Sequence, residues 1–243
     1  MINQFRDLTL LKTEPNQTLV MAAESSSSIG EKPGDQLQSP TEVTAKFAVR
    51  VCLLELLTQK AKPQAIFTLI GNEKEPTGRI MWQAIEKELE TLPFEHNIIL
   101  NGSTEDNMET NETSLGLVAV GTIDGAFESP AYQQTQMVVQ VGEPYVGAAV
   151  LENLDTVPTY QDIYEWEAQP EVIDIIPVGA NGSQADLEAL FSKYALHLNR
   201  LETSWLKKSG GPSTSFVVAL NTREIPAYLN ERYAVEVLAV PHD

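Results

Sequence analysis

The segment Asn101-Gly102-Ser103-Thr104-Glu105-Asp106-Asn107 holds the residues best suited to chemistry. It lies between two apolar runs that the sequence predicts as strands, residues 98–100 and 115–120. An Asn-Gly pair alone would make a turn, so the additional hydroxyl, carboxylate and amide groups exceed what a turn needs. Hard cations, including those that accompany phosphate groups, prefer oxygen ligands of this kind. The segment therefore indicates one side of a nucleotide site.

A second segment, residues 24–35, also follows a predicted strand and combines small residues with acids. In Gly30-Glu31-Lys32-Pro33-Gly34-Asp35 the glycines would let backbone approach a ligand, the lysine suits phosphate and Asp35 suits a metal. Neither a Walker motif nor a G-x-G-x-x-G dinucleotide motif occurs in the chain. On spacing alone, a phosphate loop and an ordinary solvated loop both remain open.

Composition narrows the classes of function. The 243 residues are 42% apolar and 21% charged, which is typical of a globular protein. With 34 acids against 16 bases, the net charge of −18 argues against binding to nucleic acid or to an anionic membrane surface. We see no signal-peptide pattern and no apolar run of about 20 residues, so the cytoplasm is the expected location.

Other catalytic patterns find no support. The three histidines are far apart in the sequence and have no metal-ligand spacing, and G-x-S-x-G is absent. The single cysteine, Cys52, lies in an apolar run, which predicts a buried and inert thiol.

The first half of the chain predicts a mixed α+β (α/β) domain. We expect strands at residues 9–11 and 18–23, joined by a turn around Glu14-Pro15-Asn16. Ser39-Pro40-Thr41-Glu42 predicts a capping box that opens a helix ending near Lys62-Pro63. A buried strand at 65–70 and a helix at 77–92 should follow.

The second half predicts a further α+β domain. Residues 121–132 contain the expected boundary, which we place between residues 128 and 129, giving domains 1–128 and 129–243. The expected elements are strands at 137–141, 172–176, 216–220 and 234–240, and a helix at 185–198.

The chain resembles the AIR synthase-like (PurM-type) ATP-binding superfamily, and within it the alpha-ribazole kinases. The most specific blocks of this resemblance lie in the first half, and those in the second half are weaker. The blocks are residues 21–35, 48–57, 101–108, Gly116, Gly121, 142–147, 176–179 and 208–212.

The resemblance implies a two-domain PurM-like architecture whose N-terminal mixed sheets pair across a homodimer. It also implies ATP and Mg²⁺ as cofactors and a small, nucleoside-like substrate. For an alpha-ribazole kinase, the γ-phosphoryl group passes to the ribose 5′-OH. Phosphoryl transfer needs positioning and charge neutralisation more than a nucleophilic side chain, which suits a histidine-poor site. The implied site comprises Glu105 and Asp35 as catalytic residues; Gly30, Lys32, Gly34, Asn101, Gly102, Thr104 and Asn107 at the nucleotide; and Glu24, Asp35, Glu105 and Asp106 at the metal.

The chain departs from the family pattern at four positions. Glu24 replaces an aspartate, Ser27-Ser28 replaces two glycines, and Glu109 replaces a proline. A glutamate side chain is one methylene longer than an aspartate, so it would displace a bound metal. A serine has a Cβ, and residues with a Cβ rarely adopt the positive φ that glycine allows. Two alternatives to the alpha-ribazole kinase therefore stay open. One is a nucleotide-binding relative that has lost catalysis, and the other is different ATP-dependent chemistry, such as ring closure or phosphorylation of thiamine phosphate.

Overall fold

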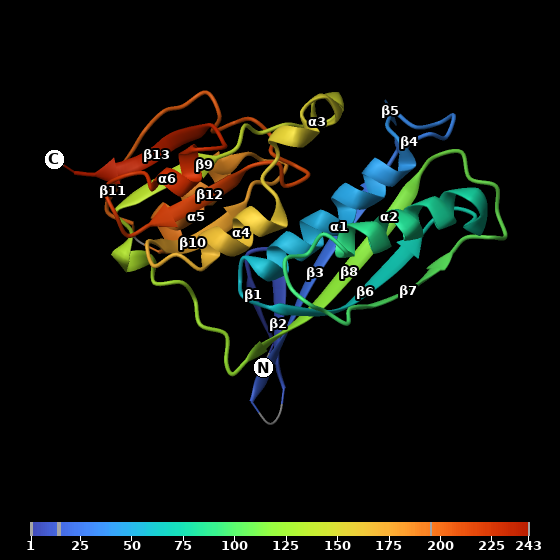
Figure 1. Ribbon diagram of the computed structural model, residues 1–243, viewed down its shortest axis with the longest axis horizontal. Coiled ribbons are helices and arrows are strands. Elements are labelled where there is room, and N and C mark those ends of the chain that lie inside the picture. Colours follow the sequence, from blue (N-terminus) through green and yellow to red (C-terminus); the bar gives the residue numbers. More distant parts are fainter. Residues whose placement is uncertain (1, 14–15, 195, 243) are drawn as a thin grey trace. The chain divides into compact units, whose positions relative to one another are not determined.

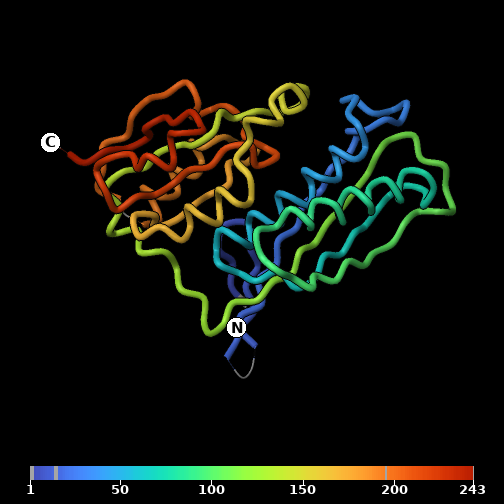
Figure 2. The backbone as a smooth tube through the Cα atoms, viewed as in Figure 1, coloured from blue at the N-terminus to red at the C-terminus, as the bar shows by residue number. Residues whose placement is uncertain are grey.

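The computed structural model describes residues 2–13, 16–194 and 196–242. The chain forms two compact units, Met1–Phe127 and Glu128–Asp243, whose elements are labelled in Figure 1 and whose backbone path is drawn in Figure 2. This division lies one residue before the boundary expected from the sequence. The expected turn at Glu14-Pro15-Asn16 involves residues 14 and 15, which lie outside the described residues.

Unit 1 is built on a six-stranded mixed sheet in the order β1-β2-β3-β8-β6-β7. Its long central strands β3 and β8 are antiparallel, whereas the edge pair β6 and β7 is parallel. A separate two-stranded parallel pair joins β4 to β5. The strand bounds are β1 Ile2–Phe5, β2 Leu8–Thr13, β3 Gln17–Ser27, β4 Ile29–Gly30, β5 Leu37–Gln38, β6 Lys62–Ile70, β7 Ile99–Thr104 and β8 Ser114–Asp124.

Two expected loops prove shorter than the sequence indicated. β3 continues to Ser27, so residues 24–27 are strand rather than loop. β7 includes residues 101–104, so only the last three residues of the segment 101–107 are loop. The reason is pairing between distant strands: Ser27 pairs with Ser114, and Thr104 pairs with Ile70.

Helices α1 (Thr41–Leu57) and α2 (Arg79–Leu89) cover one face of this sheet (Figure 1). A π-helical turn, η1 (Lys74–Gly78), leads into α2, so the helix expected over 77–92 begins later and ends sooner. The capping-box prediction is wrong, because Ser39 and Glu42 make no cap at α1. Instead the Glu31 carboxylate accepts the Thr41 N–H (3.0 Å), and this hydrogen bond lowers the pKa of Glu31.

β6 is covered on one face alone, contrary to the expectation of a strand buried on both. Ile66, Thr68 and Ile70 are buried on the face that carries the helices. Phe67 and Leu69 on the opposite face are 43% and 56% exposed. The reason is that both helices of this unit pack on the same side, and sheet side chains alternate between faces.

Unit 2 contains a five-stranded antiparallel sheet in the order β10-β12-β9-β13-β11. The expected strands at 137–141 and 216–220 are confirmed as β9 (Met137–Val141) and β12 (Phe216–Leu220). The remaining bounds are β10 Val172–Pro177, β11 Leu198–Arg200, β13 Val235–Pro241, α3 Ala148–Glu152, α4 Tyr160–Glu167, α5 Ser183–Lys193 and α6 Ala227–Asn230, with short 3₁₀ turns η2 Tyr132–Gln134 and η3 Leu154–Thr156.

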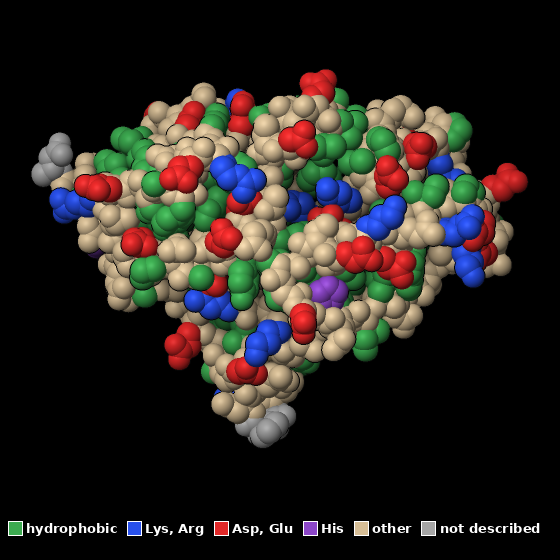
Figure 3. All heavy atoms as spheres, viewed as in Figure 1, with side chains coloured by type: hydrophobic (Ala, Val, Ile, Leu, Met, Phe, Trp, Pro, Cys, Tyr) green, Lys and Arg blue, Asp and Glu red, His purple; other side chains and the backbone are tan. Residues whose placement is uncertain are grey.

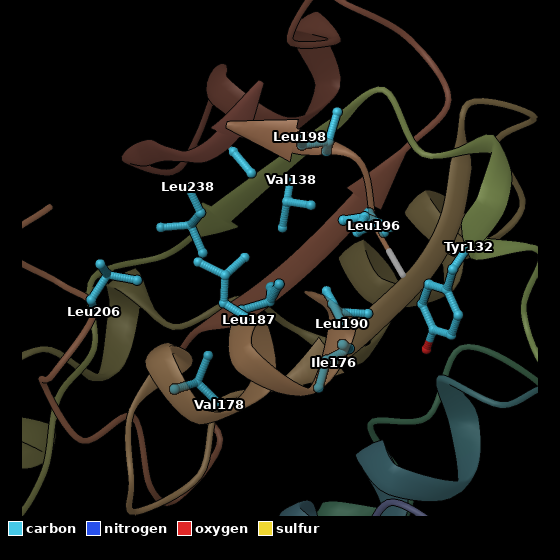
Figure 4. Close-up of a cluster of buried hydrophobic side chains, with 13 residues drawn as sticks. Tyr132, Val138, Ile176, Val178, Leu187, Leu190, Leu196, Leu198, Leu206 and Leu238 are labelled. Carbon is cyan, nitrogen blue, oxygen red and sulfur yellow. The ribbon is translucent and has the colours of Figure 1, made fainter. Parts of the chain in front are cut away.

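The core of unit 2 joins α5 to one face of its sheet. Leu187 and Leu190 of α5 pack with Val138, Val217 and other buried residues of the strands (Figure 4). The helix expected to run to residue 198 ends at Lys193, and β11 then begins at Leu198.

No helix among the described residues has the length and apolar character needed to cross a membrane. Acidic and basic side chains are interspersed over the face shown in Figure 3.

Candidate functional site

Strands β3, β6 and β7 all end at the end of the sheet where β8 begins. In the register of the sheet, Ser27 pairs with Ser114, and Ile70 pairs with Leu115. Ile70 also pairs with Thr104 on its other side. The segments that follow these three strands therefore meet at one end of the sheet. We call them the loop cluster, which consists of residues 28–40, 71–78 and 105–113.

Asp35 joins the first segment of the loop cluster to the third. Its Oδ1 accepts the Thr113 N–H (2.7 Å), and its Oδ2 accepts the Thr113 hydroxyl (2.6 Å) and the Lys32 N–H (2.8 Å). The side chain is buried, as such a well-bonded carboxylate can be. Asp35, predicted as a catalytic residue and metal ligand, therefore has both oxygens engaged in holding the two segments together.

Lys32 forms an ion pair with Glu73, in the second segment. Lys32 Nζ donates to Glu73 Oε2 at 2.8 Å. Glu73 also accepts hydrogen bonds from the hydroxyls of Thr77 and of Thr110, the latter at 3.3 Å. Burial acts to raise the pKa of Glu73, but the hydrogen bonds and the positive charge of Lys32 outweigh it and lower the pKa to about 2. Glu73 is therefore a fixed negative charge at neutral pH.

Asn72 holds the second and third segments together. Its amide nitrogen donates to Thr110 Oγ1 and to the Glu112 carbonyl, both at 2.8 Å. Its amide oxygen accepts the Ser114 N–H at 2.8 Å. The side chain is fully buried, so these three bonds satisfy a group that would otherwise be costly to bury.

Glu105 and Asp106 of the third segment are at least partly exposed, and Asp106 also contacts the second segment. Asp106 accepts the Lys74 N–H (2.6 Å) and the Thr104 hydroxyl (3.0 Å). Glu105 Oε1 accepts the Asn107 N–H (2.9 Å). Asp106 and Asn107 are exposed and Glu105 is partly exposed. These side chains lie on the accessible side of the loop cluster, where a ligand could reach them.

The glycines of the first segment allow close approach of another segment of the protein. A Cβ on Gly30 would lie 2.1 Å from Thr113 Oγ1. One on Gly34 would lie 2.6 Å from the Asn111 carbonyl oxygen, and the Gly34 N–H donates to that same oxygen (2.8 Å). Packing of the loop cluster therefore accounts for both glycines, and their expected contact with a nucleotide stays a prediction.

Asn101 and Gly102 lie in the exposed edge strand β7. Asn101 Oδ1 accepts the Gly102 N–H at 2.8 Å. Gly102 pairs with Thr68 of β6. The two residues thus precede the loop cluster, and their expected role at the nucleotide stays a prediction.

The four residues expected to depart from the family pattern, Glu24, Ser27, Ser28 and Glu109, lie in different parts of unit 1. Ser28 adopts φ +59, the left-handed backbone that a serine disfavours, and its hydroxyl bonds the Glu112 carboxylate. Ser27 is an ordinary strand residue of β3. Glu109 is exposed in the third segment. Ser28 therefore holds a backbone conformation that glycine adopts at lower cost.

Glu24 lies inside β3, three residues before the strand ends. It pairs with Leu117 on the face of the sheet that α1 covers. Burial, with a smaller contribution from the charge of Asp7, raises the pKa of Glu24 above its ordinary value. Burial, with the charge of Glu24 next in size, also raises the pKa of Cys52 to about 12, so this thiol is buried and inert as expected.

The described part of the chain contains no group of three His, Cys, Asp or Glu side chains that could hold a metal ion by themselves. The predicted metal ligands are thus spread over a strand and two segments of the loop cluster. Because Mg²⁺ commonly takes one or two carboxylates and completes its shell with phosphate and water, this arrangement is compatible with a metal that arrives with a nucleotide.

Solved structures with the same architecture include AaThiL complexed with AMPPCP and TMP. It matches with a TM-score of 0.66 over 98% of this chain and 85% of that one, at 10% identity. Thiamine-monophosphate kinase from Stenotrophomonas maltophilia K279a matches with a TM-score of 0.59 over 99% and 89%, at 15% identity. The chain has a PurM-like fold.

PurL from T. maritima complexed with ATP also matches, with a TM-score of 0.57 and 14% identity. The match covers 96% of this chain and 37% of the PurL chain, so the chain spans little more than a third of that protein. No protein-family model and no curated protein matches the chain. At these identities the likeness shows the fold, and the expected mixed α+β architecture is confirmed.

Sequence reasoning missed Asn72 and Glu73, which connect the two segments it had singled out. A signal was present, because the pair follows a predicted strand after a single residue, Gly71. Apart from Thr77, the side-chain partners of Asn72 and Glu73 lie 37 to 42 residues away, and no local pattern identifies them.

Proposed function

We propose that this chain is an ATP- and Mg²⁺-dependent kinase of a small, nucleoside-like substrate, with the 5′-OH of alpha-ribazole as the first candidate acceptor. The observation that supports this most strongly is the loop cluster. Two polar segments chosen from the sequence as nucleotide loops end at the same end of the sheet, in a fold shared with nucleotide-bound proteins. The contacts Asp35–Thr113, Lys32–Glu73 and Lys74–Asp106 link the segments of the loop cluster there.

The donor set of the loop cluster fits a magnesium nucleotide. Glu105 and Asp106 would supply carboxylate oxygens to Mg²⁺, and Lys32 would supply positive charge to phosphate. When bound, Mg²⁺ neutralises phosphate charge. Thr104 and Asn107 would assist through their side-chain oxygens. Asp35 keeps the first segment in place, which is the role that its contacts support best.

The test is ADP release by the purified chain with ATP and Mg²⁺, in the presence of alpha-ribazole, of thiamine phosphate or of neither. Release of ADP that depends on alpha-ribazole supports the proposal. Release that depends only on thiamine phosphate would instead indicate thiamine phosphate as the acceptor. Glu105→Gln should abolish turnover, and Glu86→Gln, an exposed residue of α2, should not. Undiminished turnover in Glu105→Gln would remove Glu105 from the mechanism.

A second candidate function is nucleotide binding without turnover. The observations that favour it are the strained Ser28 and the half-buried position of Glu24 within β3, outside the loop cluster. Thermal stabilisation by ATP and Mg²⁺, with no ADP release for any nucleoside tested, would support this candidate. Robust phosphorylation of any nucleoside would exclude it.

We further propose that two copies pair through the uncovered face of the unit 1 sheet. Phe67, Leu69 and Ile99 lie on this face and are 43%, 56% and 67% exposed. Ile99 pairs with Ala65, which shares the face of Phe67 and Leu69, so the three form adjacent rows. Adjacent exposed apolar side chains on a sheet favour burial against another protein surface, and a second copy presents the same surface.

The cytoplasmic location stays a prediction.

A further inference from the structure

Glu73 contacts every segment of the loop cluster. Its carboxylate accepts from Lys32 in the first segment, from Thr77 in its own segment and from Thr110 in the third. The geometry points to Glu73 as a positioning residue that fixes the Lys32 ammonium where it can meet the phosphates of a nucleotide. This inference rests on the proposed function and adds to it a residue that neither the sequence nor the fold comparisons assigned.

The argument begins with the flexibility of lysine. A lysine side chain loses substantial conformational entropy when it is held in one place, and a free ammonium would spread over many rotamers. Lys32 is held, because its Nζ lies 2.8 Å from Glu73 Oε2 and its side chain is only 17% exposed. An ammonium has three donors, and the bond to Glu73 uses one. Two donors can therefore still serve a phosphate.

Glu73 is in turn held by its own partners. The Thr77 hydroxyl donates to Oε1, and Thr110 donates to Oε2 while accepting from the buried Asn72. These contacts fix the carboxylate before any ligand arrives. A lysine paired with a glutamate is also how protein kinases place the lysine that meets ATP phosphates, so the arrangement has a chemical precedent on an unrelated fold.

The direction in which nucleotide affinity changes when Glu73 is neutralised distinguishes a positioning role from a purely electrostatic effect of its charge. Removal of a negative charge near an anion site should tighten nucleotide binding by reducing repulsion. If Glu73 positions Lys32, its neutralisation should instead weaken binding. Glu75 gives a matched control, because it lies on the same segment and pairs with Arg79 rather than Lys32.

The experiment measures Mg²⁺–ATP dissociation constants by calorimetry at fixed ionic strength, after urea unfolding has shown that each variant folds. Glu73→Gln and Lys32→Met should each weaken binding about tenfold, the size of one charge-assisted hydrogen bond. The double variant should be no weaker than either single one, because both remove the same interaction. Glu75→Gln should change affinity by less than about twofold, in the direction of tighter binding.

A second readout does not depend on nucleotide. The Lys32 Nζ resonance in a ¹⁵N NMR spectrum should show slow proton exchange in the unmodified chain and fast exchange in Glu73→Gln. If Mg²⁺–ATP binds and Glu73→Gln binds it as tightly as the unmodified chain, the positioning role is overturned while the proposed function stands. If the slow resonance is present but the unmodified chain does not bind Mg²⁺–ATP, the proposed function fails and the positioning role fails with it.

Discussion

Gly102 approaches Thr68 in the neighbouring strand so closely that a Cβ on Gly102 would lie 2.0 Å from Thr68 Oγ1 and 2.2 Å from the Thr68 carbonyl oxygen. The two residues pair in the parallel register of β6 and β7. A glycine that the family resemblance placed at the nucleotide is therefore required by the sheet itself. The loop cluster follows directly from these two strands, so their spacing helps to set its geometry.

Gly102→Ala should destabilise the chain by about 1–3 kcal/mol, because the added methyl group must push the two strands apart. Urea unfolding would measure the loss. Thr68→Ala in the same chain should restore only part of the stability, since the carbonyl oxygen of residue 68 remains in the way. Gly179→Ala is the control, because its Cβ would meet nothing within 4 Å. Full recovery in the double variant would show that the hydroxyl alone is the obstacle.

Asp35→Asn should reduce stability by about 2 kcal/mol or more even without nucleotide or Mg²⁺, because an amide cannot accept all the hydrogen bonds that Asp35 receives from Thr113 and Lys32. Asp106→Asn, at an exposed carboxylate of the same loop cluster, should cost much less. Chemical denaturation of the ligand-free variants would measure both. If Asp35→Asn altered only the response to Mg²⁺, the carboxylate would be a metal ligand rather than an anchor.

The stabilisation from Glu73 should depend on pH. Because the pKa of Glu73 falls from 4.5 to about 2 on folding, its contribution is present above pH 4.5 and is lost as the pH falls towards 2. The difference in unfolding free energy between the unmodified chain and Glu73→Gln should be constant from pH 7 to about pH 5.5 and then shrink. Urea titrations at several pH values would test this. A difference that stays constant down to pH 3 would show that folding does not lower this pKa.

Asp162 in unit 2 allows a comparison of a buried bond with an exposed ion pair. It accepts from the buried Tyr233 hydroxyl at 2.6 Å and from Arg232 Nη1 at 2.7 Å. The Arg232 side chain is 65% exposed, so solvent screens its charge. We expect Tyr233→Phe to cost about 1–2 kcal/mol and Arg232→Gln less than about 0.5 kcal/mol in thermal or urea unfolding. Equal losses would contradict this ranking.

The proposed pairing of two copies predicts a concentration-dependent mass. Light scattering at micromolar concentration should give twice the chain mass of 26.8 kDa. Leu69→Asp should shift the equilibrium to the monomer, because it places a charge in the apolar face. Leu201→Asp, an exposed leucine of unit 2, should not. A monomeric unmodified chain would exclude the pairing.

The sequence by itself determined the elements whose signals are local. The helix from Thr41 to Leu57 follows from its apolar spacing, and β9 and β12 follow from short, continuous apolar runs. It also identified two of the three segments of the loop cluster, because runs of polar groups after a strand exceed what a turn requires.

Only the tertiary structure decided how those segments are used. Pairing of β3 with β8 and of β7 with β6 extended strands into the two expected loops, and Glu31 replaced the expected cap of α1. Asp35 became an internal anchor because Thr113, 78 residues away, lies beside it. Such partners are fixed by contacts between strands far apart in the sequence. Local patterns in the sequence do not reveal contacts of this kind, and so Asn72 and Glu73 were found only in the folded chain.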